Sequence, residues 1–402
     1  MKKKTGSKRP LKRHLFLMKI LRFLLGWIFV LRFNFQHKKI KLPETPSLVL
    51  MNHNSDYDPI FAGIIFRDHL YFVTSEHLIG QTFFGRLIRF IFDPIIRVKG
   101  TTESRAAREI LTTIRKGMNV CLFAEGDRSY NGETGYISPA TGKLVKRSGA
   151  ALVTYKLRGG YFSTPRWAKG IRRGLIKGEV VNFYSKKQVE SLSNEEISSI
   201  IAKDLYVNAY EDQSTYNVRY IGNKKEYAVG IELALYICPR CKRIGTIKSS
   251  TSRFYCDCGL EMQYTEDGWI EGINGESSEF NSILEWDRWQ LKELSDRLKT
   301  TTDNSQEIFH DDMQTLYEFE LGGQRTEVIT GRLSFYRDRL EFNDSSSCIV
   351  FYFNNIDDIE VTGRMTVTFV TKDKKLFEFR SPTLRSAKKY RDSFRILKSI
   401  GA

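Results

Sequence analysis

The first half of the chain alternates apolar runs with segments that have helical spacing. Four of the apolar runs are typical of strands: residues 47–52, 71–75, 119–126 and 178–185. Residues 59–70 and 103–116 lie between them and favour helices. Strands that alternate with helices indicate an α/β fold, because parallel strands need crossover connections. The sequence therefore predicts an α/β sandwich with a mostly parallel sheet at residues 37–215.

A cluster of polar residues stands where the apolar run LVLM ends. His53 and Asp58 lie five residues apart in this cluster, in the stretch NHNSDYD. In open α/β folds, ligands bind at the carboxyl ends of the strands. If the turn brings the carboxylate of Asp58 to one imidazole N–H, the tautomer of His53 is fixed and its other nitrogen can act as a base. The same spacing also arises by chance, so the pattern alone leaves an ordinary turn open.

A second polar cluster follows the apolar run CLFA. Its residues include Glu125, Gly126 and Arg128. The arginine offers a fork that matches a phosphate, and the glycine lets the backbone approach a ligand closely. A surface turn is the alternative, because such turns often have this composition. Two clusters at the ends of two strands favour a ligand site.

Four stretches resemble conserved blocks of the glycerolipid acyltransferase family, whose best-known members are lysophosphatidate acyltransferases. NHNSDYD resembles the block N-H-x-S-x-x-D, and FAEGDRS, about 70 residues later, resembles F-P-E-G-T-R-S. FDPIIRVKG resembles the block whose arginine lies near the acceptor phosphate, which corresponds to Arg97. The stretch that ends near Pro165 resembles the block that ends in a proline. The resemblance covers roughly residues 43–213, about half of the chain.

The resemblance implies an O-acyltransferase. Such an enzyme moves a fatty acyl group from an acyl thioester, acyl-CoA or acyl-carrier protein, to a hydroxyl of a lysophospholipid such as 1-acylglycerol-3-phosphate. His53 would then be the general base, Asp58 would orient it, and Arg97 would help to hold the acceptor phosphate. Neither an acyl-enzyme nor a catalytic metal is implied. Four further residues would bind substrate: Glu125, Gly126, Arg128 and Pro165.

Two positions depart from the family pattern. Ala124 stands in place of the family proline, which changes the stiffness of the turn. Asp127 replaces the family threonine and brings a carboxylate beside the expected phosphate, which is unfavourable unless an arginine compensates. A different lysolipid, or a glycolipid without the phosphate, is therefore an alternative acceptor.

The N-terminal segment carries most of the excess charge. The net charge of the chain is +16, and residues 1–43 contain thirteen Lys or Arg and no Asp or Glu. At helical spacing Lys12, Lys19 and Arg22 fall on one side of an apolar helix. We predict that residues 1–36 form a basic amphipathic segment on the cytoplasmic face of the cell membrane, in a peripheral or monotopic arrangement. The alternative is a basic, solvated tail in front of a core helix.

Four of the six cysteines form a compact set: Cys238, Cys241, Cys256 and Cys258. Their spacing resembles a zinc ribbon at residues 232–266, with structural Zn²⁺ bound by four thiolates. A redox pair or four free thiols are the alternatives. Cys121 and Cys348 lie in apolar runs, where we expect them to be buried. No secreted disulfide framework is indicated, which favours a reducing compartment.

The last part of the chain predicts a small α+β domain. A linker helix is expected at residues 277–300, and short alternating strands followed by one amphipathic helix are expected at residues 310–402. This region resembles pleckstrin-homology-like or GRAM-like domains, which often bind lipids or proteins.

Two other functions compete with the acyltransferase. A zinc-ribbon nucleic-acid-binding protein would explain the high pI of about 9.4. However, the charge excess lies in the N-terminal segment and not in a basic stripe on the globular part, so we expect no nucleic-acid partner. A catalytically inactive membrane scaffold is the third possibility, although both His53 and Asp58 are present. The expected partners are membrane lipids and the acyl donor, and the oligomeric state is not predicted.

Overall fold

The chain is divided by its contacts into two units. The computed structural model describes residues 11–75, 83–97, 104–222, 224–273, 277–320, 325–344 and 346–401. The first unit consists of Met1–Val98, Glu103–Pro165 and Ile171–Ile221. The second unit consists of Lys99–Thr102, Arg166–Gly170 and Gly222–Ala402, so it includes a short piece of chain from within the predicted α/β domain.

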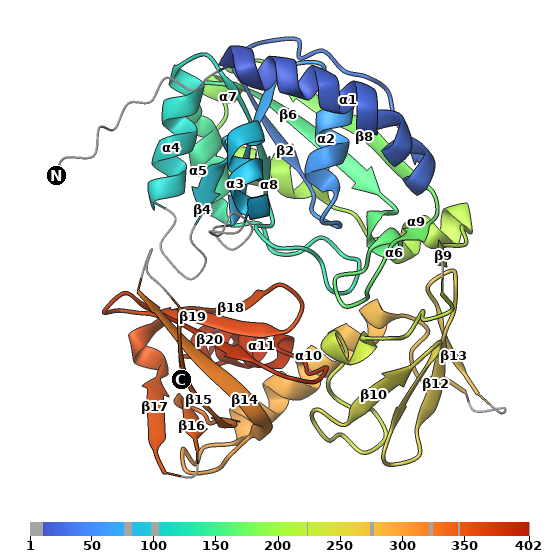
Figure 1. The fold of residues 1–402 in the computed structure, drawn as a ribbon, viewed down its shortest axis with the longest axis vertical. Coiled ribbons are helices and arrows are strands. Elements are labelled where there is room, and N and C mark those ends of the chain that lie inside the picture. The colour runs from blue at the N-terminus through green and yellow to red at the C-terminus, as the bar shows by residue number, and fades with distance from the viewer. Residues whose placement is uncertain are drawn as a thin grey trace. The chain divides into compact units, whose positions relative to one another are not determined.

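A seven-stranded sheet forms the centre of the first unit (Figure 1). Its strand order is β1-β8-β6-β2-β5-β3-β4, and all neighbours pair in parallel except β6 and β8. This arrangement confirms the predicted α/β fold with a mostly parallel sheet. The strands are β1 (Phe35–Gln36), β2 (Ser47–Met51), β3 (Leu70–Ser75), β4 (Ile95–Arg97), β5 (Asn119–Phe123), β6 (Ala151–Arg158) and β8 (Ile176–Tyr184). Two short strands lie outside it, β7 (Arg172–Arg173) and β9 (Ile221–Gly222).

Helices cover both faces of this sheet because its central strand β2 is apolar on both. Val49 and Met51 belong to the core shared with α1 and α2, whereas Leu48 and Leu50 belong to the core shared with α4, α5 and α8. Burial on both faces is typical of parallel strands. The helices are α1 (Leu11–Phe33), α2 (Asp58–Ile65), α3 (Phe83–Phe92), α4 (Ser104–Arg115), α5 (Pro139–Ser148), α6 (Gly160–Ser163), α7 (Lys186–Ser191), α8 (Asn194–Leu205) and α9 (Ala209–Tyr216).

Helix α1 is part of the folded unit and not a detached arm. Phe33 is fully buried and stacks edge-on against Phe61 of α2, with ring centroids 5.2 Å apart. Arg22 donates hydrogen bonds to backbone carbonyls at the end of α2, including Gly63 at 2.6 Å and Arg67 at 2.9 Å. The expectation that Arg22 faces lipid headgroups was therefore wrong. Its guanidinium donates to backbone carbonyls at the end of α2, which have no partner within the helix.

The second unit contains two antiparallel sheets. The smaller has the order β10-β11-β12-β13 and the larger has the order β17-β16-β15-β14-β20-β19-β18. The strands of the smaller sheet are β10 (Ile247–Ser250), β11 (Arg253–Cys256), β12 (Glu261–Tyr264) and β13 (Ile270–Gly272). Those of the larger sheet are β14 (Phe309–Glu320), β15 (Arg325–Phe335), β16 (Arg339–Asn343), β17 (Cys348–Tyr352), β18 (Ile356–Thr362), β19 (Thr366–Thr371) and β20 (Lys375–Arg380). Its helices are α10 (Ile283–Thr300), α11 (Lys388–Ser399) and the short 3₁₀ turns η2 (Ile231–Leu233) and η3 (Phe353–Asn355).

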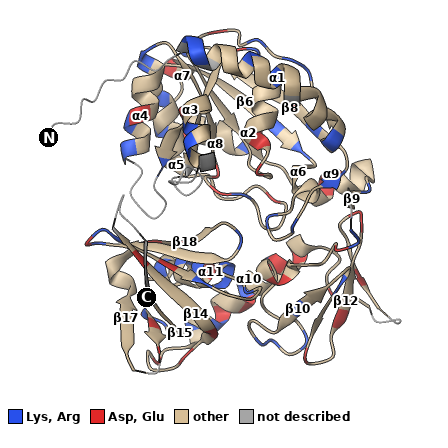
Figure 2. Cartoon of the chain, in the orientation of Figure 1, with Lys and Arg blue, Asp and Glu red and all other residues tan. Residues whose placement is uncertain are grey.

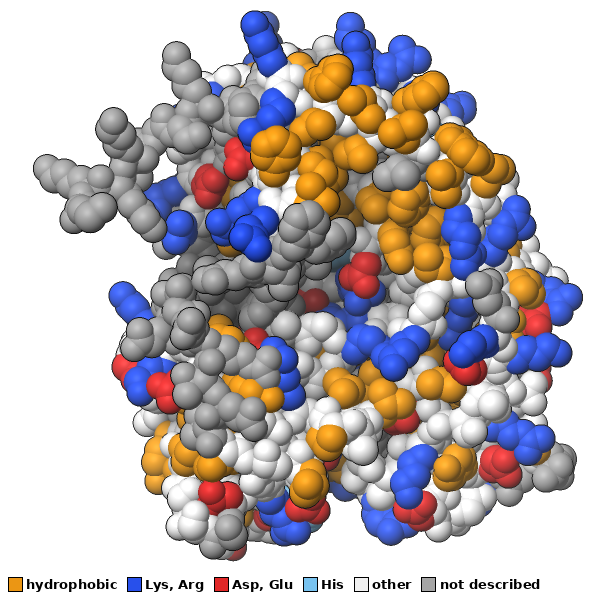
Figure 3. Space-filling model, in the orientation of Figure 1, with side chains coloured by type: hydrophobic (Ala, Val, Ile, Leu, Met, Phe, Trp, Pro, Cys, Tyr) orange, Lys and Arg blue, Asp and Glu red, His pale blue; other side chains and the backbone are white. Residues whose placement is uncertain are grey.

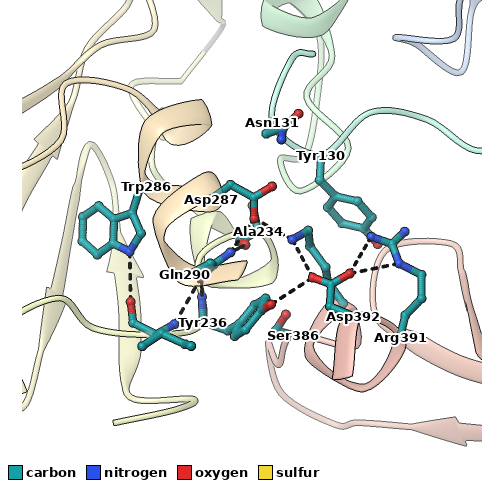
Figure 4. A network of polar contacts seen from close by, with 12 residues as sticks. Tyr130, Asn131, Ala234, Tyr236, Trp286, Asp287, Gln290, Ser386, Arg391 and Asp392 are labelled. Atoms are coloured by element: carbon teal, nitrogen blue, oxygen red, sulfur yellow. Dashed lines mark hydrogen bonds and ion pairs between the residues drawn. The ribbon is translucent and has the colours of Figure 1, made fainter. Parts of the chain in front are cut away.

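A buried polar network joins α10, α11 and the chain that precedes the cysteine cluster (Figure 4). The ammonium of Lys388 lies 2.6 Å from a carboxylate oxygen of Asp287 and 2.7 Å from one of Asp392. Tyr236 donates its hydroxyl to Asp392 at 2.9 Å. Burial alone would lower the pKa of Lys388. The two carboxylates have the larger combined effect and raise the pKa above its ordinary value. The linker helix is therefore built into the second unit and does not stand apart as a spacer.

The two cysteines outside the cluster differ in burial. Cys121 is buried in β5, as expected. Cys348 is exposed, so the prediction that it is buried was wrong. It begins β17, which is an edge strand with one neighbour, and an alternating apolar run cannot show which strand ends at the edge.

Candidate active site

The end of strand β2 is held in place by a buried asparagine. The amide of Asn52 donates to the carbonyl of Leu157 at 2.8 Å and accepts from the N–H of the same residue at 2.8 Å. These bonds tie the chain after β2 to the end of β6. The turn that follows therefore starts from a fixed position at the carboxyl edge of the sheet.

Residues 53–58 fold around one carboxylate oxygen of Asp58. This oxygen lies 2.9 Å from Nδ1 of His53, and it accepts the N–H groups of Asn54 at 2.8 Å and Ser55 at 2.9 Å. The side chain of Asp58 is 1% exposed and that of His53 is 19% exposed. Because Nδ1 of His53 meets the carboxylate, the imidazole is oriented with Nε2 directed away from Asp58.

The start of helix α2 is stabilised by Ser55 and not by the residue directly before the helix. Tyr57 precedes the helix and makes no side-chain cap. Ser55 instead accepts the N–H of Tyr57 on its hydroxyl at 3.0 Å. The N–H groups of residues 54, 55 and 57 are thus all used inside the turn.

Glu125 connects the second polar cluster to the first. Its Oε1 accepts the backbone N–H of His53 at 2.7 Å, and its Oε2 accepts the N–H of Gly135 at 2.7 Å. Both carboxylate oxygens are therefore bonded to the protein backbone. This geometry gives Glu125 a positioning role beside the acceptor-binding role implied by the family resemblance.

Replacing Glu125 tests this positioning role. We expect Glu125→Ala to lower the free energy of unfolding by about 1–3 kcal/mol, because two backbone N–H groups lose their acceptor. Chemical denaturation measures the change. Glu133→Ala is the control, since Glu133 accepts the hydroxyl of the exposed Tyr206 and its loss should cost less than about 0.5 kcal/mol. Equal losses in both variants would contradict the assignment.

The protonation of Glu125 should make stability depend on pH. Burial raises its pKa to about 8 from an ordinary value of 4.5, against the two N–H donors, which favour the ionised form. The folded chain then holds a proton that the unfolded chain releases. The free energy of unfolding should therefore fall as pH rises from about 4.5 to about 8. This slope should be absent from Glu125→Ala.

The arginines of the predicted acceptor site are engaged with neighbouring groups. Arg97 lies at the end of β4, and its Nη1 is 3.4 Å from the carbonyl of Gly126. A Cβ at Gly126 would come within 2.5 Å of this Nη1, and the φ of Gly126 is +70°, so only glycine fits there. Nε of Arg128 lies 3.0 Å from Oδ1 of Asp56, which is exposed, so this ion pair is weak.

Several residues of the site were missed by sequence reasoning. Asn52 and Asp56 lie in the stretch NHNSDYD without an assigned role, and Thr164 lies outside both motifs. Thr164 donates its hydroxyl to that of Ser55 at 2.8 Å. Gly160 packs so closely on the turn that a Cβ there would lie 3.3 Å from that of Asn54. The sequence signal for this contact was the Gly159-Gly160 pair directly after a strand. The pair lies just before Pro165, the last residue of this segment of the first unit.

The second unit brings the four cysteines together. The sulfur atoms of Cys238, Cys241, Cys256 and Cys258 all lie within 4.8 Å of one another. The sulfurs of Cys238 and Cys258 are 3.6 Å apart, and those of Cys241 and Cys256 are 3.7 Å apart. A tetrahedral Zn–S centre with bonds of about 2.3 Å requires sulfurs about 3.8 Å apart. The donor set and its spacing therefore fit zinc.

Comparisons with known proteins identify one part of the chain. Residues 32–157 match the family model described as Acyltransferase. No curated protein matches the sequence significantly. Among solved structures, the 1-acyl-sn-glycerophosphate (LPA) acyltransferase PlsC from Thermotoga maritima is 17% identical over 52% of this chain and 84% of that chain, with a TM-score of 0.40.

Two further solved structures match shorter parts. The 8S snRNP assembly intermediate is 8% identical over 25% of this chain and 88% of that chain, with a TM-score of 0.21. The inner membrane complex sub-compartment protein 3 from Toxoplasma gondii is 13% identical over 28% of this chain and 88% of that chain, with a TM-score of 0.19. The segment of residues 32–157, which contains the turn of His53 and Asp58 and the cluster of Glu125, is thus the part of the chain that matches an acyltransferase family.

Proposed function

We propose that the protein is a glycerolipid acyltransferase that moves a fatty acyl group from acyl-CoA or acyl-carrier protein to a hydroxyl of a lysophospholipid such as 1-acylglycerol-3-phosphate. The observation that carries this proposal is the contact of 2.9 Å between His53 and Asp58 at the carboxyl edge of the sheet. It lies inside the segment that matches the acyltransferase family.

The reaction needs one general base and no side-chain nucleophile. Nε2 of His53 takes the proton of the acceptor hydroxyl while the hydroxyl oxygen attacks the thioester carbonyl carbon. The C–S bond then breaks, and the thiolate leaves with the proton that His53 carried. Asp58 holds the imidazole by Nδ1 and stabilises its charged form between the two steps.

The acceptor headgroup would lie beside two arginines and two acids. Arg97 and Arg128 supply the positive charge that a phosphate needs. Asp56 and Asp127 lie in the same two motifs and bring opposite charge. A lysophospholipid remains the first choice, and the balance of charges makes lysolipids with neutral headgroups the main competitors.

The direct test is a product analysis. The full chain is mixed with acyl-CoA or acyl-carrier protein thioesters and with a panel of lysolipids, and products are identified by mass spectrometry. Appearance of a diacyl product from one acceptor identifies the acceptor. Formation of no acylated lipid from any pair would contradict the function and favour an inactive scaffold.

The outer face of α1 is the proposed membrane contact. Seven apolar side chains of α1 are exposed on it: Phe16, Ile20, Phe23, Leu24, Trp27, Ile28 and Leu31. They form part of the apolar surface visible in Figure 3. Basic residues lie toward both ends of the helix, Lys12 at the start and Arg32 in the last turn (Figure 2). Of the helices that the structure describes, none is long and apolar enough to cross a bilayer. We therefore propose peripheral or monotopic attachment at the cytoplasmic face of the cell membrane.

Substitutions on this face test the attachment. Deletion of α1 is unsuitable because Phe33 belongs to the core. Phe16, Phe23 and Trp27 are 64%, 81% and 61% exposed, so replacing all three by Ser should leave the fold intact. The three substitutions should remove about 3–6 kcal/mol of binding free energy that comes from burying these side chains in the membrane. Binding to vesicles of phosphatidylcholine and phosphatidylglycerol should therefore weaken roughly a hundredfold or more.

The control for this variant is Met313→Ser, because Met313 is 64% exposed and lies in the second unit. It should bind vesicles like the wild type in a sedimentation assay. Added salt should weaken wild-type binding only in part, because salt screens charges and leaves the apolar contribution. Unchanged binding of the triple variant would contradict the assignment of this face.

The second unit is proposed to be an accessory part of the enzyme. Residues 232–266 form a zinc-ribbon-like module in which the four cysteines hold structural Zn²⁺, and four thiolates leave no open position for catalysis. Helix α10, at Ile283–Thr300 within the linker expected at residues 277–300, connects this module to the last region. Residues 310–402 form a pleckstrin-homology-like or GRAM-like domain, supported by the seven-stranded antiparallel sheet and its closing helix α11.

A further inference from the structure

A short piece of chain from within the α/β domain is built into the core of the second unit. Residues 166–170 belong to that unit, although β6 and β8 on either side belong to the first. Trp167 in this piece is fully buried and meets Tyr264 of β12 edge-on, with ring centroids 5.3 Å apart. We call residues 166–170 the anchor segment.

Two polar contacts and a close approach fix the anchor segment. The buried guanidinium of Arg166 donates to the carbonyl of Val361 at 2.8 Å. The guanidinium of Arg364 donates to the carbonyl of Trp167. A Cβ at Gly230 would come within 2.3 Å of this same carbonyl. The anchor segment therefore contacts the smaller sheet through Tyr264, the larger sheet through Val361, and the turn at Gly230, all within the second unit.

The residues directly before the anchor segment lie on the turn of His53 and Asp58. Thr164 is buried and donates its hydroxyl to Ser55 at 2.8 Å. Ser55 in turn gives its N–H to Asp58 and accepts the N–H of Tyr57. One residue, Pro165, separates Thr164 from the anchor segment. Because proline restricts both its own φ and the residue before it, this connection is stiff.

We propose that Arg166 and Trp167 are positioning residues, which hold the turn of His53 and Asp58 through Thr164 and Ser55. Under this proposal the second unit has a defined role in the enzyme: it fixes one end of a stiff, four-residue connection whose other end is bonded to the turn. The catalytic consequence rests on the proposed function. The mechanical coupling does not, so it can be tested without any acyl transfer.

Hydrogen exchange of the full-length protein measures this coupling at residues 53–58. Trp167→Ala should raise the exchange rates of these amides by about tenfold or more, because the anchor can then open locally. Trp167→Phe keeps a ring against Tyr264 and should exchange nearly as the wild type does. Phe309→Ala is the control for general loosening of the second unit, since Phe309 is buried against Phe335 and Tyr390 and away from the anchor contacts named above.

A second variant separates the connection from the anchor. Thr164→Val keeps the shape of the side chain and removes the hydroxyl that bonds Ser55. It should deprotect residues 53–58 and leave residues 166–170 protected. If Trp167→Ala deprotects residues 166–170 while residues 53–58 exchange at the wild-type rate, or if Thr164→Val leaves residues 53–58 protected, the proposal is wrong. If exchange changes as expected in a protein that acylates no lipid, the coupling stands and the proposed function fails.

In an active enzyme the same variants should show a kinetic signature. Trp167→Ala should lower kcat about tenfold or more with little change in KM, because the base is misoriented while the acceptor contacts remain. Trp167→Phe should restore kcat. A rise in KM alone would assign the segment to substrate binding and overturn the positioning role.

Discussion

His53→Ala is expected to lower the rate of acyl transfer by about 10²–10⁴-fold and to leave the fold intact. The size of the loss follows from the usual contribution of a positioned general base. The fold should survive because the imidazole is partly exposed and its main partner, Asp58, keeps two backbone N–H donors in its absence. Release of free thiol from the acyl thioester, followed with saturating acceptor, measures the rate.

Two further variants make this result specific. Asp58→Asn should lose most of the activity, because the neutral amide does not fix the tautomer of His53 or stabilise its charged form as the carboxylate does. His37→Ala is the matched control, since His37 is a partly buried histidine that stacks on Phe35 outside the site. It should keep wild-type turnover. If His53→Ala retains more than about a tenth of the wild-type rate, His53 is not the base.

The contact between His53 and Asp58 was predictable because it is local. Four residues of turn separate the two side chains, and the start of a helix places the second beside the first. The contact of Glu125 with the N–H of His53 was not predictable in this way. It depends on the register of β2 and β5, in which Met51 pairs with Phe123. Residues 53 and 125 each follow their member of this pair by two positions, so they come out side by side at the end of the sheet. Parallel strands are joined by long crossovers, and the sequence carries no direct signal of their register.

The errors of the sequence reasoning have a similar origin. Arg22 was placed toward lipid because its spacing on α1 groups it with other cations, yet the end of α2 offers carbonyls that it satisfies. Likewise nothing in the stretch STPRW marks where the first unit gives way to the second. The burial of Trp167 depends on Tyr264, almost a hundred residues later in the chain, and only the folded chain brings them together.

The cysteine cluster is expected to bind one Zn²⁺ per chain, with a large effect on the stability of the small sheet. Structural zinc in peptides of this kind binds with about 10–16 kcal/mol at neutral pH, and that binding energy is also folding energy. Elemental analysis of protein purified without chelators measures the metal content. Cys238→Ser should lose the zinc, whereas Cys348→Ser, which removes an exposed cysteine outside the cluster, should keep it.

Loss of the zinc should loosen the small sheet before the sheet of the first unit, because the turns that carry the cysteines lose their cross-link, although Phe254, Met262 and Tyr264 are buried in it. The turns around the cysteines are short, and the N–H of Gly259 donates to the carbonyl of Cys256 at 2.9 Å to close one of them. Hydrogen exchange should therefore show rapid deprotection of β10, β11 and β12 after chelation, while β2 and β5 of the first unit stay protected by their own core. Protein that holds no metal, or holds iron, would contradict the zinc site. Equal protection of the small sheet with and without metal would show that its apolar side chains suffice, and that the four cysteines meet for another reason.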